Sequence, residues 1–203
     1  MDEIIMLSST IHLPYIKNTY SEAINETMDM QYSYEDFLKL ILSKEIDLKK
    51  QNRINTRIKK AKFPYLKVFE EMNFGAFSLE IANKIRELQN LNFLDTGQNV
   101  ILVVDSGIGK THTAIILGIR ACMVGKSVLY ITVPNLITEF KKSMTINQLT
   151  AYKKKFINYD LVILDELGYI FFDKLGEELL FNLLSMRNDT KSMIITTNLA
   201  FNK

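Results

Sequence analysis

Residues 99–113, NVILVVDSGIGKTHT, constrain the fold more than any other stretch of the chain. An apolar run from Val100 to Val104 has the length of a buried strand, and a short loop with two glycines follows it. Lys110 and Thr111 then open a segment in which apolar residues recur with helical spacing, at Ala114, Ile115, Leu117, Ile119 and Cys122. The order of strand, glycine loop and helix predicts a phosphate-binding loop at the first turn of a helix.

Backbone N–H groups in such a loop, and at the start of the helix, donate hydrogen bonds to phosphate oxygens. Lys110 is then expected to reach the β- and γ-phosphates, and the Thr111 hydroxyl to bind Mg²⁺. The residues expected to contact the nucleotide are Asp105, Ser106, Gly107, Ile108, Gly109, Lys110, Thr111 and His112. The full pattern G-x-x-x-x-G-K-[ST] requires a glycine where this chain has Val104, and the Asp105 carboxylate is expected to repel phosphate, so we expect reduced affinity. A glycine-containing turn between a core strand and a core helix is the alternative.

A second apolar run, Leu161 to Leu164, leads directly into Asp165 and Glu166. A continuous apolar run is typical of a strand covered on both faces, and parallel sheets bind ligands at the carboxyl ends of their strands. We therefore expect Asp165 to hold Mg²⁺ through water and Glu166 to polarise the water that attacks the γ-phosphate. A charged turn after a strand is the alternative.

Residues 192–198, SMIITTN, predict a further strand that ends in a polar amide. Asn198 is placed to reach the attacking water or the γ-phosphate from a neighbouring strand, whereas a turn-forming asparagine is the alternative. Another buried strand is expected at 127–132, and helices are expected at 78–91 and 175–186. This alternation of strands and helices predicts an α/β fold with a parallel sheet of P-loop type.

A long helix is predicted from a capping box at Ser33 and Asp36 to about residue 60. Its residues 49–60 hold no acid, and four basic residues in that segment fall along one helix face: Lys49, Arg53, Arg57 and Lys60. This basic stripe is a candidate contact for the backbone of double-stranded DNA. A solvated helix face is the alternative.

Composition excludes several other classes of protein. The 203 residues are 47% hydrophobic and 24% charged, as in ordinary globular proteins, and the longest apolar runs have strand length, so no membrane segment is expected. The N-terminus lacks the basic flank of a signal peptide, so a cytoplasmic location is expected. The single cysteine, Cys122, lies on the apolar helix face and is expected to be a buried thiol; His12 and His112 lack the spacing of zinc ligands.

Several of these stretches carry a family resemblance. They are YSYEDFLKLIL at 32–42, AKFP at 61–64, GIGKTHTA at 107–114, YDLVILDELGYIFFDKLGEELLFNLLSMR at 159–187 and SMIITTNLAF at 192–201. In them the chain resembles the IstB-like ATP-binding proteins, which are AAA+ helpers of insertion-sequence transposition and relatives of the bacterial replicative-helicase loaders. The DELGY segment, followed by the LGEELLF helix and IITTN, is the specific part of this resemblance.

The resemblance implies the AAA+ P-loop NTPase fold. Counted along the chain, its parallel strands are expected in the order 1-4-3-2, with the family's fifth strand missing because the sequence stops at Lys203. Residues 1–77 are then an N-terminal helical region for DNA or partner contact, and residues 78–203 are the ATPase core. The implied catalytic residues are Lys110, Glu166 and Asn198, and the implied Mg²⁺ residues are Thr111 and Asp165.

The implied function is an ATPase that forms homo-oligomers on double-stranded DNA in the presence of ATP and works with a transposase. A replicative-helicase loader is an alternative in the same fold. A third alternative belongs to another class: a non-catalytic module for DNA or protein contact. Its nucleotide site would have degenerated, because the family's loop begins GPPG where this chain has Val104-Asp105-Ser106-Gly107.

Overall fold

The computed structural model describes residues 2–29, 32–67, 69, 72, 74–103, 109–145, 147–168, 173–188 and 190–198. The chain divides into two compact units, residues 1–56 and residues 57–203. Within the described residues, no helix has both the length and the apolar character needed to cross a membrane. The predicted phosphate-loop positions Asp105, Ser106, Gly107 and Ile108 lie outside the described residues.

The first unit is helical. It contains α1 (Glu3–Thr10), α2 (Pro14–Asp29) and most of α3 (Tyr34–Ala61). The predicted capping box is present at the start of α3, where the Asp36 N–H donates to the Ser33 hydroxyl oxygen at 3.2 Å. The buried Glu45 carboxylate of α3 accepts the N–H groups of Tyr15 at 2.9 Å and Ile16 at 3.2 Å, so it caps the start of α2.

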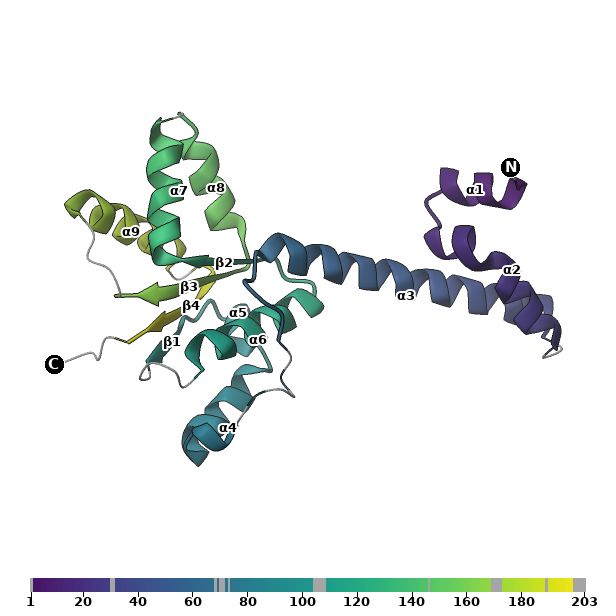
Figure 1. Cartoon of the computed structure of the whole chain (residues 1–203), viewed down its shortest axis with the longest axis horizontal. Helices are drawn as coiled ribbons and strands as arrows, with labels where there is room; N and C mark the ends of the chain where they lie inside the picture. Colours follow the sequence, from purple (N-terminus) through teal and green to yellow (C-terminus); the bar gives the residue numbers. More distant parts are fainter. Residues whose placement is uncertain are drawn as a thin grey trace. The chain divides into compact units, whose positions relative to one another are not determined.

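The second unit contains a parallel sheet with the strand order β1-β4-β3-β2 (Figure 1). Its strands are β1 (Val100–Val103), β2 (Val128–Thr132), β3 (Leu161–Leu167) and β4 (Ser192–Thr197). This order confirms the predicted sheet. Val103 pairs with Thr197 and Thr132 pairs with Asp165, so the carboxyl ends of all the strands meet at one edge of the sheet.

Helices cover both faces of this sheet (Figure 1). Among the described residues, the helical elements of this unit after α3 are η2 (Phe74–Ala76), α4 (Leu79–Leu88), α5 (Asn92–Asp95), α6 (Lys110–Met123), α7 (Val133–Thr145), α8 (Leu149–Asn158) and α9 (Lys174–Arg187). Alternate residues of β3 point to opposite faces: Leu161 and Ile163 join the core beneath α6, whereas Val162 and Leu164 join the core beneath α7, α8 and α9. These four side chains are at most 1% exposed, which explains the continuous apolar run in the sequence.

The helix α6 lies close to the sheet because of Gly118. A Cβ atom at this position would lie 2.7 Å from Ile163 Cδ1 and 2.8 Å from Phe63 Cε1. Phe63 and Ala61 pack in the α6 core, so the segment after residue 56 belongs to the second compact unit. The predicted boundary at residue 77 separates an N-terminal region for DNA or partner contact from an ATPase core. This boundary stays a prediction.

Candidate nucleotide site

The start of α6 lies at the carboxyl end of the sheet, as the sequence predicts. Gly109 precedes the helix with φ +96°, a left-handed conformation that favours glycine. Lys110 is the first helical residue and is only 9% exposed. The first N–H groups of α6 lack partners within the helix, as at the start of any α-helix.

Thr111 and Asp165 are in direct contact although they are 54 residues apart in the sequence. The Thr111 hydroxyl donates to Asp165 Oδ1 at 2.9 Å. Asp165 lies near the end of β3 and is 2% exposed. The structure thus brings together the two residues that the sequence predicts as Mg²⁺ ligands.

The Asp165 carboxylate accepts two further hydroxyl groups. Tyr130 from β2 donates to Oδ2 at 2.5 Å, and Thr196 from β4 donates to Oδ1. Burial, the hydrogen bond from Tyr130 to Asp165 and the charge of Asp165 raise the pKa of Tyr130 well above its usual range. The phenol therefore remains protonated and remains a donor. Neither Tyr130 nor Thr196 is predicted as a site residue from the sequence.

Glu166 differs from Asp165 in both exposure and backbone conformation. It is exposed, its φ is +65°, and its N–H donates to the Thr196 hydroxyl oxygen at 3.1 Å. The pairing of β3 with β4 is irregular here, because Leu164 pairs with Ile195 but Leu167 pairs with Thr197. Two residues of β3 therefore face one residue of β4. This bulge leaves the Asp165 side chain buried and the Glu166 side chain exposed.

Two other predicted residues border this edge of the sheet. Asn198 follows β4 directly and is exposed. His112 lies in the first turn of α6, its ring centroid is 6.0 Å from that of Tyr65, and its buried Nε2 has no hydrogen-bond partner among the described residues. Burial and the charge of Asp165 raise the pKa of Tyr65. Tyr65 therefore also lies near the site, although the sequence shows only an aromatic residue outside any motif.

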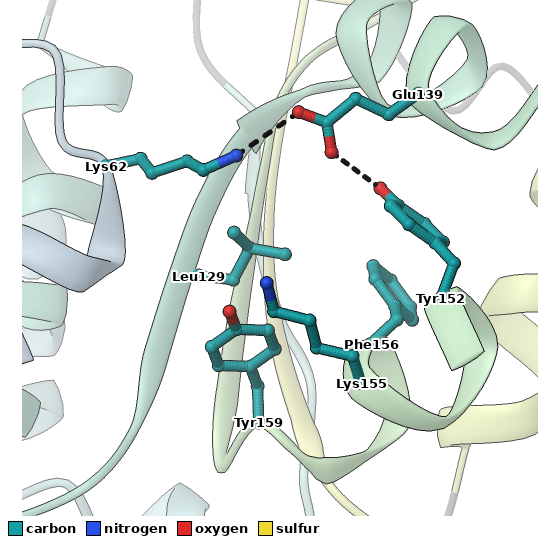
Figure 2. Close-up of a pocket in the computed structure, with 7 residues that line it drawn as sticks. All are labelled: Lys62, Leu129, Glu139, Tyr152, Lys155, Phe156 and Tyr159. Carbon is teal, nitrogen blue, oxygen red and sulfur yellow. Dashed lines mark hydrogen bonds and ion pairs between the residues drawn. The ribbon is translucent and has the colours of Figure 1, made fainter. Parts of the chain in front are cut away.

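A second concave surface of the same unit lies beside β2 and is lined by Lys62, Leu129, Glu139, Tyr152, Lys155, Phe156 and Tyr159 (Figure 2). Glu139 lies between two of these side chains. Lys62 Nζ is 3.2 Å from its Oε1, and the Tyr152 hydroxyl donates to its Oε2 at 3.0 Å. Glu139 thus compensates the charge of Lys62, one of the two lysines in this pocket. No predicted nucleotide-site residue is among the described residues that line the pocket.

All four residues of the basic stripe lie in α3. Arg53 and Lys60 are exposed, whereas Lys49 and Arg57 are half-buried. Lys49 Nζ is 3.9 Å from Glu45 Oε1, which is a long and weak ion pair. The helix is confirmed, and the DNA contact stays a prediction.

Residues 7–203 match the family model described as IstB-like ATP binding protein. The chain belongs to this family. This IstB-like chain is 31% identical over 202 residues to the insertion sequence IS21 putative ATP-binding protein of Pseudomonas aeruginosa, covering 99% of this chain and 76% of that relative. It is 30% identical over 197 residues to the insertion sequence IS232 putative ATP-binding protein of Bacillus thuringiensis subsp. berliner, with 95% and 79% covered. The resemblance seen in the sequence is confirmed.

The solved structure of the DnaC helicase loader is similar to this IstB-like chain, with a TM-score of 0.55 and 23% identity, covering 72% of this chain and 81% of that one. The replication initiator DnaA bound to AMPPCP and single-stranded DNA gives a TM-score of 0.54 with 16% identity over 60% of this chain and 38% of that one. At this level of identity the likeness concerns the fold alone. The α/β sheet, with its order β1-β4-β3-β2, is the AAA+ P-loop fold.

Proposed function

We propose that this IstB-like chain binds ATP with Mg²⁺ and acts as an AAA+ helper ATPase of DNA transposition. The observation that carries the proposal is the hydrogen bond between Thr111 and Asp165, because it joins the start of α6 to the end of β3. A hydroxyl and a carboxylate at these two places are what a P-loop site uses to place its metal ion.

The residues at this edge fit Mg²⁺ better than a softer metal. The available ligand atoms are the oxygens of Thr111 and Asp165, and Mg²⁺ prefers few protein oxygens supplemented by phosphate and water. Among the described residues there is no group of three or more His, Cys, Asp or Glu side chains that could hold a metal ion. When bound, Mg²⁺ would neutralise charge on the β- and γ-phosphates.

Each protein group has a separate role in the proposed reaction. Lys110 stabilises the charge on the transferred phosphoryl group, Glu166 orients the attacking water, and Asn198 senses the γ-phosphate. The exposure of Glu166 and Asn198 supports these roles because both side chains are accessible to a ligand at the sheet edge.

Equilibrium binding of a fluorescent ATP analogue with Mg²⁺ tests the nucleotide site. Lys110→Ala is expected to lower affinity at least about tenfold, since the lysine reaches the phosphates as a point charge. Lys126→Ala is the matched control, because Lys126 lies beyond the other end of α6, where its Nζ is 3.1 Å from Asp95 Oδ1. Equal affinity in wild type and Lys110→Ala would refute the assignment.

The proposal includes binding of double-stranded DNA through the basic stripe, formation of homo-oligomers and a transposase partner. Titrating duplex DNA at several salt concentrations tests the stripe, because each lost phosphate contact lowers the slope of log K against log salt by about 1. Arg53→Ala is the test variant. Lys44→Ala is its control, since Lys44 is exposed on α3 about 140° around the helix from Lys49. The same slope in both variants would contradict a role for Arg53.

A helicase loader is the second candidate, and the likeness in fold to the DnaC helicase loader supports it. Co-purification with a replicative helicase instead of a transposase would favour it. A non-catalytic module is the third candidate and is supported by Val104 and Asp105. If the double substitution Val104→Gly and Asp105→Pro gives no gain in nucleotide affinity, this third candidate is favoured.

A further inference from the structure

The Thr196 hydroxyl lies between the two acidic residues of the candidate site. It donates its hydrogen to Asp165 Oδ1 and accepts the N–H of Glu166 at 3.1 Å. A threonine hydroxyl has one hydrogen to donate and lone pairs to accept, so both kinds of bond are formed. Thr196 is 2% exposed, so its hydroxyl is shielded from bulk water.

The accepted bond stabilises an irregular backbone. The bulge between β3 and β4 takes the Glu166 N–H out of the regular ladder, and Glu166 adopts φ +65°, which is uncommon for a residue other than glycine. A backbone N–H that is partly shielded from water is costly to leave without a partner, and the Thr196 oxygen supplies that partner. The same hydroxyl thus fixes the Asp165 carboxylate and the backbone that presents Glu166.

We propose that Thr196 is a positioning residue that sets both the Asp165 carboxylate and the Glu166 backbone for nucleotide chemistry. The inference rests on the proposed ATPase function. It gives Thr196 a role distinct from that proposed for Asn198, which follows the same strand directly and is exposed.

The experiment compares three variants of the full chain. Thr196→Val keeps the branched shape and removes the hydroxyl, whereas Thr196→Ser keeps the hydroxyl and removes a methyl group. Ser192→Ala is the matched control, because Ser192 begins β4, is fully buried and donates its hydroxyl to the Phe93 carbonyl at 2.7 Å. If Thr196→Val fails to fold, Thr196→Ala replaces it.

Two readouts are measured for each variant. The first is hydrogen exchange of the Glu166 amide in the nucleotide-free protein, which we expect to accelerate about tenfold or more in Thr196→Val. The second is ATP affinity with and without Mg²⁺ together with the single-turnover hydrolysis rate. Removal of a group that orients a metal ligand lowers metal affinity or activity by about 10–100-fold.

The inference expects Thr196→Val to lose amide protection, Mg²⁺ dependence and turnover together, and Thr196→Ser to retain all of them. It is overturned if Glu166 exchange is unchanged in Thr196→Val, or if that variant loses no more Mg²⁺ dependence and turnover than Ser192→Ala. Absence of nucleotide binding in the wild type would refute the proposed ATPase instead. In that case the exchange rate of the Glu166 amide still decides whether Thr196 sets this backbone.

Discussion

The substitution Arg187→Met is expected to remove a buried hydrogen-bond network at the end of the sheet opposite the candidate site. Arg187 is the last residue of α9 and is 0% exposed. Its guanidinium donates four hydrogen bonds to backbone carbonyls: Phe156 at 2.7 Å, Ile157 at 3.1 Å, Tyr159 at 3.0 Å and Ser192 at 3.0 Å. These bonds connect the last carbonyls of α8, which lack helical partners, to the start of β4.

The expected loss of unfolding free energy is the difference between the contribution of the hydrogen bonds and the cost of burying the charge. Each hydrogen bond from a charged donor contributes about 1.5–3 kcal/mol, so the four together contribute roughly 6–12 kcal/mol. Burial lowers the pKa of Arg187 from 12.5 to about 10, and at about 1.4 kcal/mol per pKa unit the buried charge costs roughly 3 kcal/mol. Because water can reach some of the freed carbonyls in the variant, we expect a net loss at the lower end of the range that remains when the cost of the buried charge is subtracted from the hydrogen-bond contribution. The free energy of unfolding should fall by about 3–5 kcal/mol.

Urea unfolding followed by circular dichroism measures this loss. Arg120→Met is the control, because Arg120 is exposed on α6 and donates one hydrogen bond, from Nε to the Gln89 carbonyl at 2.7 Å. The control is expected to lose less than about 1 kcal/mol, as exposed single contacts usually do. If Arg187→Met lies within about 1 kcal/mol of Arg120→Met, the four buried bonds do not stabilise the fold in net terms.

Other perturbations test packing, thiol burial and acid sensitivity in the second unit. Gly118→Ala should cost about 1–3 kcal/mol of unfolding free energy, and Ile163→Val, which removes the clashing methyl group, should recover part of that loss in the double mutant. Because Cys122 is fully buried and burial raises its pKa to about 11, an aromatic disulfide reagent at neutral pH should modify the native protein at least about a hundredfold more slowly than the urea-unfolded protein. Burial opposes ionisation of Asp160, but hydrogen bonds, the largest from Lys191, lower its pKa to about 2 from 3.8. The stabilisation that ionised Asp160 contributes is present above pH 3.8 and is lost as the pH falls towards about 2. The free energy of unfolding of Asp160→Asn should therefore depend less on pH in that window than that of the wild type. An unchanged pH dependence of this free energy would contradict the prediction.

Local sequence signals predict the helices and strands of this fold well, because capping residues and runs of apolar residues mark individual elements. The capping box places the start of α3, and continuous apolar runs place the strands that are covered on both faces. Lys110, Thr111 and Asp165 stand at element ends, where a motif and the direction of a parallel strand fix their position. The strand order required the family resemblance, since the apolar runs of β1 and β3 say nothing about which strands are neighbours.

The residues that the sequence leaves unrecognised depend on contacts between distant elements. Tyr130 has the pattern of any aromatic residue in a strand, and its contact with Asp165 follows from the register of β2 against β3. Thr196 meets both acids because of a bulge, which no local signal in β3 indicates. Arg187 has the pattern of a basic residue in the last turn of a helix, where exposure is the ordinary outcome.

The candidate nucleotide site has two halves: one contains Thr111 and Asp165, which are proposed to hold Mg²⁺, and the other is the predicted phosphate loop. The hydrogen of the Thr111 hydroxyl is used on Asp165, so its lone pairs are left for a cation, and Asp165 itself is held by Tyr130 and Thr196. The proposed metal-binding half is therefore organised by contacts within the protein. The departures from the phosphate-loop pattern, Val104 and Asp105, belong to the other half, so they should weaken ATP affinity while its dependence on Mg²⁺ is retained. A chain that binds ATP weakly and equally well with and without Mg²⁺ would contradict this division of the site.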